Sequence, residues 1–213
     1  CALCQKKMKE LGIGNVDGLQ AHLISHMGKF LNEHGRQLVG WDEVIAGNLS
    51  KNTTVMVWRG TELAHEAIKH GYDVVMSPGA YCYFDNGGFI PTEKVYSYVP
   101  GSDLPEAERN MITGVQANLW TEHIPTPEYA EYMLYPRALA LAEIGWNGTK
   151  TKNYPEFKTR ALAQVEHLKA EGVNPFELKK EIGERKEKMK PVQHKAVGAK
   201  VTYNHAYNRY YPA

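Results

Sequence analysis

The pattern of apolar and polar positions along the chain predicts short strands that alternate with helices. Short apolar runs bounded by glycine, proline or polar residues have the length and composition of buried strands. Four such runs are expected to be strands, at residues 37–41, 53–58, 73–76 and 111–115. Strands separated by helical segments favour a parallel sheet. The pattern therefore predicts an α/β fold.

The clearest helical pattern covers residues 17–35. Apolar residues recur there three and four positions apart and form one stripe, as expected of a helix that packs one face on a core. Asp17 is expected to cap this helix and Gly35 to end it. The stripe consists of Leu19, Leu23, Met27, Phe30 and Leu31. Further helices are expected over residues 61–70, 105–110, 126–145 and 153–170, with a kink at Pro136.

Three segments do not follow this alternation. Residues 80–100 contain many tyrosines and turn residues, including Asn86-Gly87-Gly88. We expect them to form a long loop between a strand and a helix, and long loops inside compact domains usually have a functional role. Residues 179–190 are mostly charged, and the tail 196–213 does not continue the helical pattern. We therefore expect a folded domain over residues 1–190 and a linker, or the start of another module, over residues 191–213.

Length and charge limit the classes of protein that fit. A chain of 213 residues is long enough for one domain with a substantial core. A net charge of +1 gives no electrostatic footprint for nucleic acid, and no apolar run approaches membrane-spanning length. We therefore expect neither a nucleic-acid partner nor membrane insertion.

The three cysteines do not define a metal or redox site by sequence. Cys1 and Cys4 form a C-x-x-C pair and Cys82 stands alone. Zinc would need two more soft ligands, and a redox motif usually lies between a strand and a helix. His22 and His26 are four residues apart but lack the neighbouring Glu of a zinc-hydrolase helix. Incidental thiols or a local disulfide are favoured, with no metal and no cofactor.

Aromatic and acidic residues gather at the carboxyl ends of the expected strands. Those ends meet at one edge of a parallel sheet, where barrel enzymes place their active sites. For one tryptophan, burial in the core is an equally good explanation, but strands bury their middles, and three of the four tryptophans fall at this end. Rings beside carboxylates suit a carbohydrate. The residues are Trp41, Trp58, Tyr83, Asp85, Trp120 and Glu122.

Five segments, in this order and spacing, resemble glycoside hydrolase family 20, the β-N-acetylhexosaminidases. They are Gly40–Glu43, Trp58–Gly60, Tyr83–Asp85, Gly114–Glu122, and Tyr135–Arg137 with Ala142–Glu143. The resemblance covers roughly residues 1–172. It implies a (β/α)8 TIM barrel, of which this chain holds about the last four βα units and C-terminal helices. The implied substrates are glycans that end in β-linked N-acetylglucosamine or N-acetylgalactosamine.

The resemblance also implies a role for each strand-end residue. Tyr83 would donate its hydroxyl to the acetamido oxygen, Asp85 would bind a hydroxyl near the 6-position, and Glu122 would bind the 4-hydroxyl. The acetamido oxygen would then attack the anomeric carbon in a substrate-assisted, retaining reaction. The walls of the acetamido methyl slot would be Trp41, Trp58 and Trp120.

The family's catalytic pair has no counterpart in this sequence. An Asp-Glu pair after His-x-Gly-Gly supplies the general acid in the family, and neither that sequence nor the family's first-strand Arg occurs here. We therefore expect no catalytic residue in this chain and no turnover by it alone. The expected whole is a longer periplasmic or secreted protein whose targeting segment is not in this chain.

Two alternatives remain open. Asp42 and Glu43 are an adjacent acid pair near a strand end, but they follow Trp41, and in the family this Gly-Trp-Asp-Glu lies one strand after the catalytic pair. A structural role is favoured for both. The second alternative is a non-catalytic aminosugar-binding or scaffold half-barrel. Half a barrel has two open sheet edges, which we expect to be covered by a second copy or by the tail and terminal helices.

Overall fold

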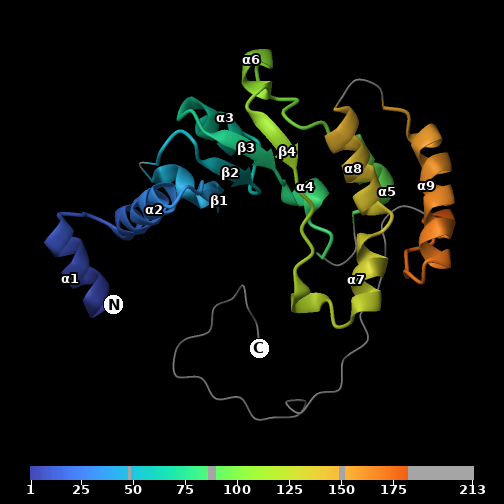
Figure 1. The fold of residues 1–213 in the computed structure, drawn as a ribbon, viewed down its shortest axis with the longest axis horizontal. Helices are drawn as coiled ribbons and strands as arrows, with labels where there is room; N and C mark the ends of the chain where they lie inside the picture. Colours follow the sequence, from blue (N-terminus) through green and yellow to red (C-terminus); the bar gives the residue numbers. More distant parts are fainter. Residues whose placement is uncertain (48, 86–89, 149–151, 182–213) are drawn as a thin grey trace, which may run out of the picture.

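Four parallel strands form the sheet at the centre of the computed structural model, which describes residues 1–47, 49–85, 90–148 and 152–181 (Figure 1). They pair in chain order, β1-β2-β3-β4, and every pair is parallel. All four expected strands are therefore confirmed, with bounds shorter than the apolar runs. The strands are β1 (Val39–Trp41), β2 (Thr54–Val57), β3 (Asp73–Met76) and β4 (Ile112–Val115).

The two central strands bury alternate residues, as the two-residue period of a strand requires. Val55 and Val57 of β2 are fully buried, as are Val74 and Met76 of β3, and their neighbours are only half-buried. Helix α3 (Glu62–Lys69) packs against both strands. The sheet thus has a fully covered face and a more open one.

Two helices precede the sheet, α1 (Ala2–Leu11) and α2 (Val16–Glu33). The amide of Gly18 donates to Asn15 Oδ1 at 2.7 Å, so Asn15 caps α2 and the expected cap, Asp17, lies inside the helix. No helix was expected over residues 2–11, because that segment is short and basic. Met8 is its buried residue, and α1 packs against α2.

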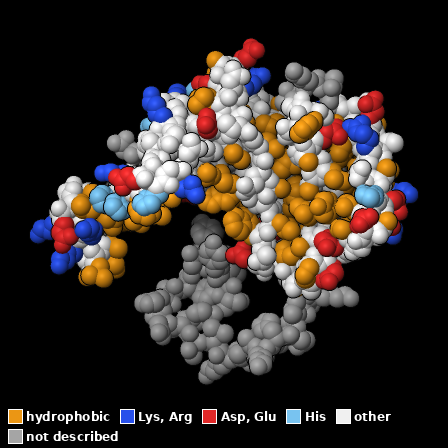
Figure 2. Space-filling model, in the orientation of Figure 1, with side chains coloured by type: hydrophobic (Ala, Val, Ile, Leu, Met, Phe, Trp, Pro, Cys, Tyr) orange, Lys and Arg blue, Asp and Glu red, His pale blue; other side chains and the backbone are white. Residues whose placement is uncertain are grey.

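The apolar stripe of α2 does not face the core as its spacing predicts. Leu23, Met27 and Phe30 are 56%, 47% and 55% exposed. Ile24 and the buried Gly28 face the core instead. Each follows a residue of the stripe, Leu23 or Met27, by one position in the sequence. In the described part of the chain, α2 packs mainly on α1 and on η1 (Asp42–Ala46), which leaves the stripe open. Figure 2 shows hydrophobic side chains reaching the surface along this helix.

The described residues at 80–85 and 90–100 contain helices where a long loop was expected. They include the end of α4 (Gly79–Cys82) and all of α5 (Thr92–Ser97), whose Val95 and Tyr96 are buried where α5 packs on α8. Both helices are too short for a helical period to stand out in the sequence. The expected Asn86-Gly87-Gly88 turn lies outside the described residues.

The predicted helix 126–145 is two helices, α7 (Pro127–Leu134) and α8 (Arg137–Asn147). Proline lacks the amide that continues a helix and disfavours helical geometry in the residue before it. Tyr135 is accordingly extended, with ψ 141°. Pro136 therefore ends one helix instead of kinking a single one.

The remaining predicted elements agree with the sequence pattern. Helix α6 (Glu106–Arg109) falls in the predicted range. Helix α9 (Tyr154–Ala170) is capped, as expected, by Asn153, whose Oδ1 accepts the Glu156 amide at 3.3 Å. The described residues also form two short helices that the pattern did not predict, η2 (Thr121–His123) and η3 (Leu178–Lys180). The boundary near residue 190 and the tail after it lie outside the described residues. None of the described helices is long and apolar enough to cross a membrane.

Candidate functional site

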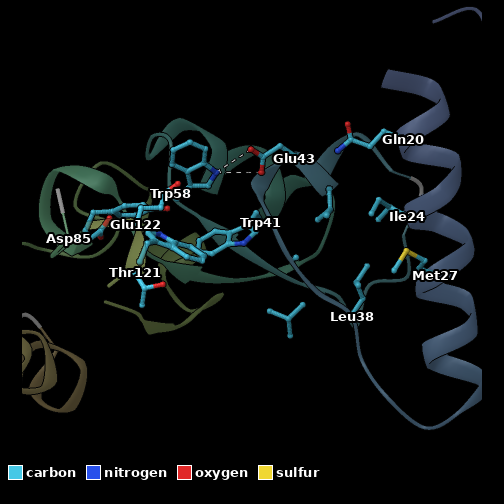
Figure 3. Close-up of a pocket in the computed structure, with 15 residues that line it drawn as sticks. Gln20, Ile24, Met27, Leu38, Trp41, Glu43, Trp58, Asp85, Thr121 and Glu122 are labelled. Carbon is cyan, nitrogen blue, oxygen red and sulfur yellow. Dashed lines mark hydrogen bonds between the residues drawn. The ribbon is translucent and has the colours of Figure 1, made fainter. Parts of the chain in front are cut away.

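A cavity of about 900 Å³ lies at the carboxyl ends of the four strands, between them and α2 (Figure 3). Each strand contributes through the segment that follows it, and α2 contributes Gln20, Ile24 and Met27. All six of the strand-end residues singled out by sequence line this one cavity. They are Trp41, Trp58, Tyr83, Asp85, Trp120 and Glu122.

The aromatic lining consists of two ring pairs. The rings of Trp41 and Trp120 are 5.9 Å apart at 47°, and those of Trp58 and Tyr83 are 6.0 Å apart at 33°. Trp120 is 45% exposed, which is a large apolar area to leave open to solvent. The fourth tryptophan, Trp146, is 90% exposed on α8 and does not line the cavity.

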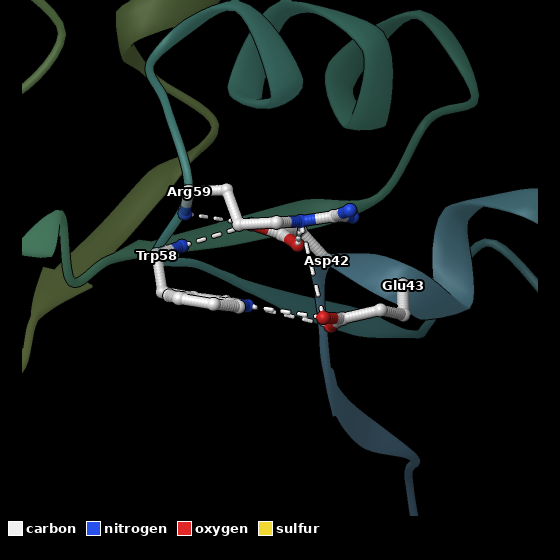
Figure 4. A network of polar contacts seen from close by, with 4 residues as sticks. All are labelled: Asp42, Glu43, Trp58 and Arg59. Carbon is white, nitrogen blue, oxygen red and sulfur yellow. Dashed lines mark hydrogen bonds and ion pairs between the residues drawn. The ribbon is translucent and has the colours of Figure 1, made fainter. Parts of the chain in front are cut away.

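The turn after β1 is set by close packing at Gly40. A Cβ at Gly40 would lie 2.5 Å from Cγ1 of Val44, so any other residue here would force the buried Val44 side chain to shift. The chain passes from Trp41 directly into η1, whose first two residues are Asp42 and Glu43. The two adjacent acids bind different groups: Asp42 accepts backbone amides, and Glu43 accepts the indole N–H of Trp58 (Figure 4).

The Asp42 carboxylate binds backbone amides of the segment that follows β2. One carboxylate oxygen accepts the amides of Trp58 at 2.9 Å and Arg59 at 3.1 Å, and the other accepts Nε of Arg59 at 2.5 Å. The Asp42 side chain is fully buried. Its hydrogen bond to the Arg59 guanidinium raises the Arg59 pKa. Asp42 thus fixes the end of β2 and does not line the cavity.

Glu43 lies at the cavity wall. The indole Nε1 of Trp58 donates to its carboxylate at 3.3 and 3.4 Å, and Arg59 Nε lies 3.9 Å from it. Its side chain is 40% exposed. This contact holds the plane of the Trp58 ring against the cavity (Figures 3 and 4).

A polar network that the sequence pattern did not reveal joins the ends of β3 and β4. Tyr83 and Asn118 form a parallel bridge, the Phe84 amide donates to the Asn118 carbonyl at 2.8 Å, and the Asn118 amide donates to the Cys82 carbonyl at 2.7 Å. The side-chain amide of Asn118 donates to Oγ of Ser77 at 2.6 Å. The only signal in the sequence was a change from apolar to polar residues after each strand. This network sets the separation of Tyr83 from Trp120.

The two polar groups of the Tyr83–Asp85 segment differ in what they offer a ligand. Burial raises the pKa of the Tyr83 hydroxyl, a hydrogen bond from Trp120 lowers it, and nearby carboxylates led by Asp85 raise it. The net shift is upward, so the hydroxyl stays protonated and can donate. Asp85 is 5% exposed, and no donor among the described residues reaches its Oδ1.

Arg137 holds this segment from behind. It is fully buried, its guanidinium lies 4.7 Å from the centre of the Phe84 ring, and Nη2 donates to the Phe84 carbonyl at 2.8 Å. It also donates to the carbonyls of Met133 and Ile90. Sequence reasoning singled out Tyr135-Pro136-Arg137 only as part of a resemblance and assigned Arg137 no contact. Nothing in local sequence places an arginine of one helix beneath a distant strand end.

Within the described residues, no three His, Cys, Asp or Glu side chains converge on a point that could hold a metal ion. The cavity lining combines indole rings, three carboxylates and the Tyr83 phenol with aliphatic side chains, the Gln20 amide and the Thr121 hydroxyl. These groups can stack on an apolar ligand face and exchange hydrogen bonds with hydroxyl and amide groups.

Four parallel strands with a cavity at their carboxyl ends define part of a β/α barrel. Solved structures agree. An exo-β-N-acetylglucosaminidase from Vibrio harveyi, solved with N-acetylglucosamine, superposes with a TM-score of 0.74 at 30% identity over 82% of this chain and 30% of its own. The chitobiase of Flavobacterium johnsoniae gives a TM-score of 0.69 at 30% identity over 79% of this chain and 27% of its own.

Residues 1–149 match the model of glycosyl hydrolase family 20, catalytic domain, and the chain belongs to this family. The beta-hexosaminidase of Porphyromonas gingivalis is 37% identical over 188 residues, which are 82% of this chain and 24% of that protein. The beta-hexosaminidase of Vibrio furnissii is 34% identical over 67% of this chain and 26% of its own. The resemblance and the fold class are confirmed. The chain spans about a quarter of the length of these two relatives.

Proposed function

We propose that this chain is part of a β-N-acetylhexosaminidase that removes terminal β-linked N-acetylglucosamine or N-acetylgalactosamine. The observation that carries the proposal is the convergence of three tryptophans, one tyrosine and three carboxylates, those of Glu43, Asp85 and Glu122, on one cavity at the strand ends. The family relationship and the names of the relatives support the same reaction.

In this proposal the cavity holds the acetamido side of the terminal sugar. The methyl group lies between the rings of Trp41, Trp58 and Trp120, where its burial is favourable. The Tyr83 hydroxyl donates to the acetamido oxygen and turns it toward the anomeric carbon. That oxygen is the nucleophile, so the family needs no carboxylate nucleophile.

In this proposal the carboxylates of Asp85 and Glu122, which line the same cavity, fix the ring of the sugar. Asp85 accepts from a hydroxyl near the 6-position, which gives its unpaired Oδ1 a donor. Glu122 accepts from the 4-hydroxyl. Sugar hydroxyls are good donors to carboxylates, because charge-assisted hydrogen bonds are stronger than neutral ones. The preference between the 4-epimers, gluco and galacto, would then depend on Glu122.

No residue of this chain acts as the general acid in the proposal. Asp42 is committed to the Trp58 and Arg59 amides, and Glu43 to the Trp58 indole. General acid catalysis is worth about 10²–10⁴-fold in rate. With a chromogenic N-acetylglucosaminide, we expect no hydrolysis above the blank. Hydrolysis that Glu43→Gln abolishes would instead place the general acid at Glu43. Reading the coding sequence before Cys1 for His-x-Gly-Gly-Asp-Glu tests the origin of the missing acid directly.

Binding tests the pocket separately from turnover. At about 0.3 kcal/mol per non-hydrogen atom, a sugar of this size reaches a Kd on the order of a millimolar. We expect the chain to bind N-acetylglucosamine in this range and to bind glucose more weakly, because glucose lacks the acetamido group. Trp120→Ala should weaken binding about tenfold, whereas the matched control Trp146→Ala should not. Equal binding by the two variants, measured by ligand-observed NMR, would contradict the proposed methyl slot.

One observation favours the second candidate, a self-associating half-barrel scaffold. The side chains of Leu23, Met27 and Phe30 and the edge residue Val39 are about half-exposed, and apolar area of this kind favours association. In this proposal a second copy covers α2 and the β1 edge. Light scattering should then give a dimer that Phe30→Glu converts to a monomer. A monomeric wild-type chain would exclude the dimer.

The remaining proposal concerns location. We propose, from the resemblance to the family, that the parent protein is periplasmic or secreted. Fractionation of cells that carry the parent gene tests this, and recovery of the protein only with cytoplasmic markers would contradict it.

A further inference from the structure

A pair of thiols lies at the start of α1, away from the residues that line the cavity. Cys1 caps the helix and Cys4 lies in its first turn. Residues three apart in a helix share one face, so the two side chains meet. The Sγ atoms are 3.2 Å apart, and the Cys4 amide lies 3.4 Å from Sγ of Cys1. A disulfide needs about 2.05 Å between the sulfurs. Small rotations of the two side chains would bring them to this distance.

We propose that Cys1 and Cys4 form a reversible dithiol–disulfide site that exchanges with small-molecule disulfides. The observation that carries this proposal is the juxtaposition of two sulfurs within reach of a bond. Cys1 is exposed and Cys4 is half-buried, so a disulfide in solution reaches Cys1 first. The helix N-terminus stabilises negative charge on the Cys1 sulfur, which is the attacking form of a thiol.

The exchange has two steps, and the disulfide reagent is the oxidant. The Cys1 thiolate attacks one sulfur of the reagent, forms a mixed disulfide and releases the first reagent thiolate, which takes up a proton. The Cys4 thiolate then attacks Sγ of Cys1, forms the internal disulfide and releases the second reagent thiolate. Two electrons pass from the protein to the reagent, and two protons leave the cysteines for the two released thiols.

The third cysteine cannot compete for this chemistry in the folded chain. Cys82 is fully buried in α4, and burial raises the pKa of its thiol to about 12. It therefore stays in the unreactive thiol form at neutral pH. Helix α1 also contains three lysines and one glutamate, so it attracts an anionic disulfide such as oxidised glutathione.

The test uses the 213-residue chain in buffers of varied oxidised-to-reduced glutathione ratio, with acid quenching, alkylation and peptide mass mapping. We expect a Cys1–Cys4 disulfide that forms and is reduced again reversibly. Closure is intramolecular, so half-oxidation should need at least about tenfold less oxidised glutathione than half-glutathionylation of Cys1 in the Cys4→Ser variant. Cys4→Ser should trap the mixed disulfide at Cys1, and Cys82→Ala should change none of these results.

Three outcomes would overturn the proposal. One is that both thiols remain alkylatable at excess oxidised glutathione. Another is that glutathione accumulates on Cys1 of the wild-type chain without ring closure. The last is that the disulfide that forms joins Cys82 to either residue.

Discussion

The guanidinium of Arg137 lies over the ring of Phe84 and donates to the Phe84 carbonyl at 2.8 Å, so a helix of the carboxyl-terminal half holds the segment between Tyr83 and Asp85. Phe84 is itself fully buried. The two neighbours of Phe84 line the cavity. Because Tyr83 and Asp85 are the chain neighbours of Phe84, holding the ring and the carbonyl of Phe84 restrains the backbone that carries both of them.

Removing the Arg137 guanidinium should therefore destabilise the chain. Arg137→Met keeps much of the side chain's length but leaves the carbonyls of Phe84, Met133 and Ile90 without this donor. We expect a loss of about 3–5 kcal/mol in the free energy of unfolding, measured by urea denaturation. Arg137→Lys should lose less unfolding free energy than Arg137→Met, because the lysine ammonium can replace some of the hydrogen bonds that the guanidinium donates. Wild-type stability in Arg137→Met would contradict this account of the contact.

Asp42 and Glu43 should respond differently to substitution because one binds backbone amides and the other lies at a cavity wall. Asp42→Ala leaves the amides of Trp58 and Arg59 unpaired next to a buried site, and should cost about 2–4 kcal/mol in unfolding free energy. Glu43→Gln can still accept from the Trp58 indole and should change stability by no more than about 0.5 kcal/mol. Urea titrations of both variants give the comparison. A stability loss in Glu43→Gln as large as that in Asp42→Ala would contradict the assignment.

The Cys82 thiol should make stability fall at alkaline pH. Its pKa is raised by burial from 9.0 to about 12 in the folded chain. Above pH 9 the unfolded chain loses this proton and the folded chain keeps it, so rising pH favours unfolding. The contribution is complete below pH 9 and is lost toward pH 12, with a slope of at most about 1.4 kcal/mol per pH unit.

The comparison is made from pH 9 to 10, because above pH 10 the raised pKa values of Tyr83, Tyr96 and Tyr98 add to the loss of stability. Burial lowers the pKa of Lys152, which acts in the opposite direction but equally in the wild type and in Cys82→Ala. In that interval Cys82→Ala should show a flatter dependence of unfolding free energy on pH than the wild type. Parallel curves for the two chains would show that the buried thiol is not the source.

The sequence predicted the strands and the composition of the cavity well, because both depend on short local patterns. Each strand is a compact apolar run, and parallel strands bring their ends together without further information. Trp41, Trp58, Tyr83 and Trp120 could therefore be placed at one site before any contact was known.

Contacts between distant segments were not predictable in the same way. The apolar stripe on α2 has a helical period, and the helix forms as predicted. The stripe does not face the core, however, since Ile24 and Gly28 do so and Phe30 is open to solvent. The role of Arg137 depends on how α8 packs beside β4, which no local pattern specifies. Pro136 was expected to bend a helix, but it separates two helices, and the carbonyl of the extended Tyr135 accepts the amide of the distant Phe176 at 3.1 Å, a contact that no local pattern specifies.

The central claim is that three tryptophans form the wall of a slot for the acetamido methyl group. The chain has four tryptophans, so ¹⁵N-labelled protein should give four indole N–H signals in a heteronuclear NMR spectrum. Substitution of each tryptophan in turn assigns these signals. Titration with N-acetylglucosamine should move the signals of Trp41, Trp58 and Trp120 with one shared dissociation constant and leave that of Trp146 in place. Glucose at the same concentrations should move them much less. If N-acetylglucosamine moved none of the three, or moved Trp146 as far, the account of the pocket would be wrong.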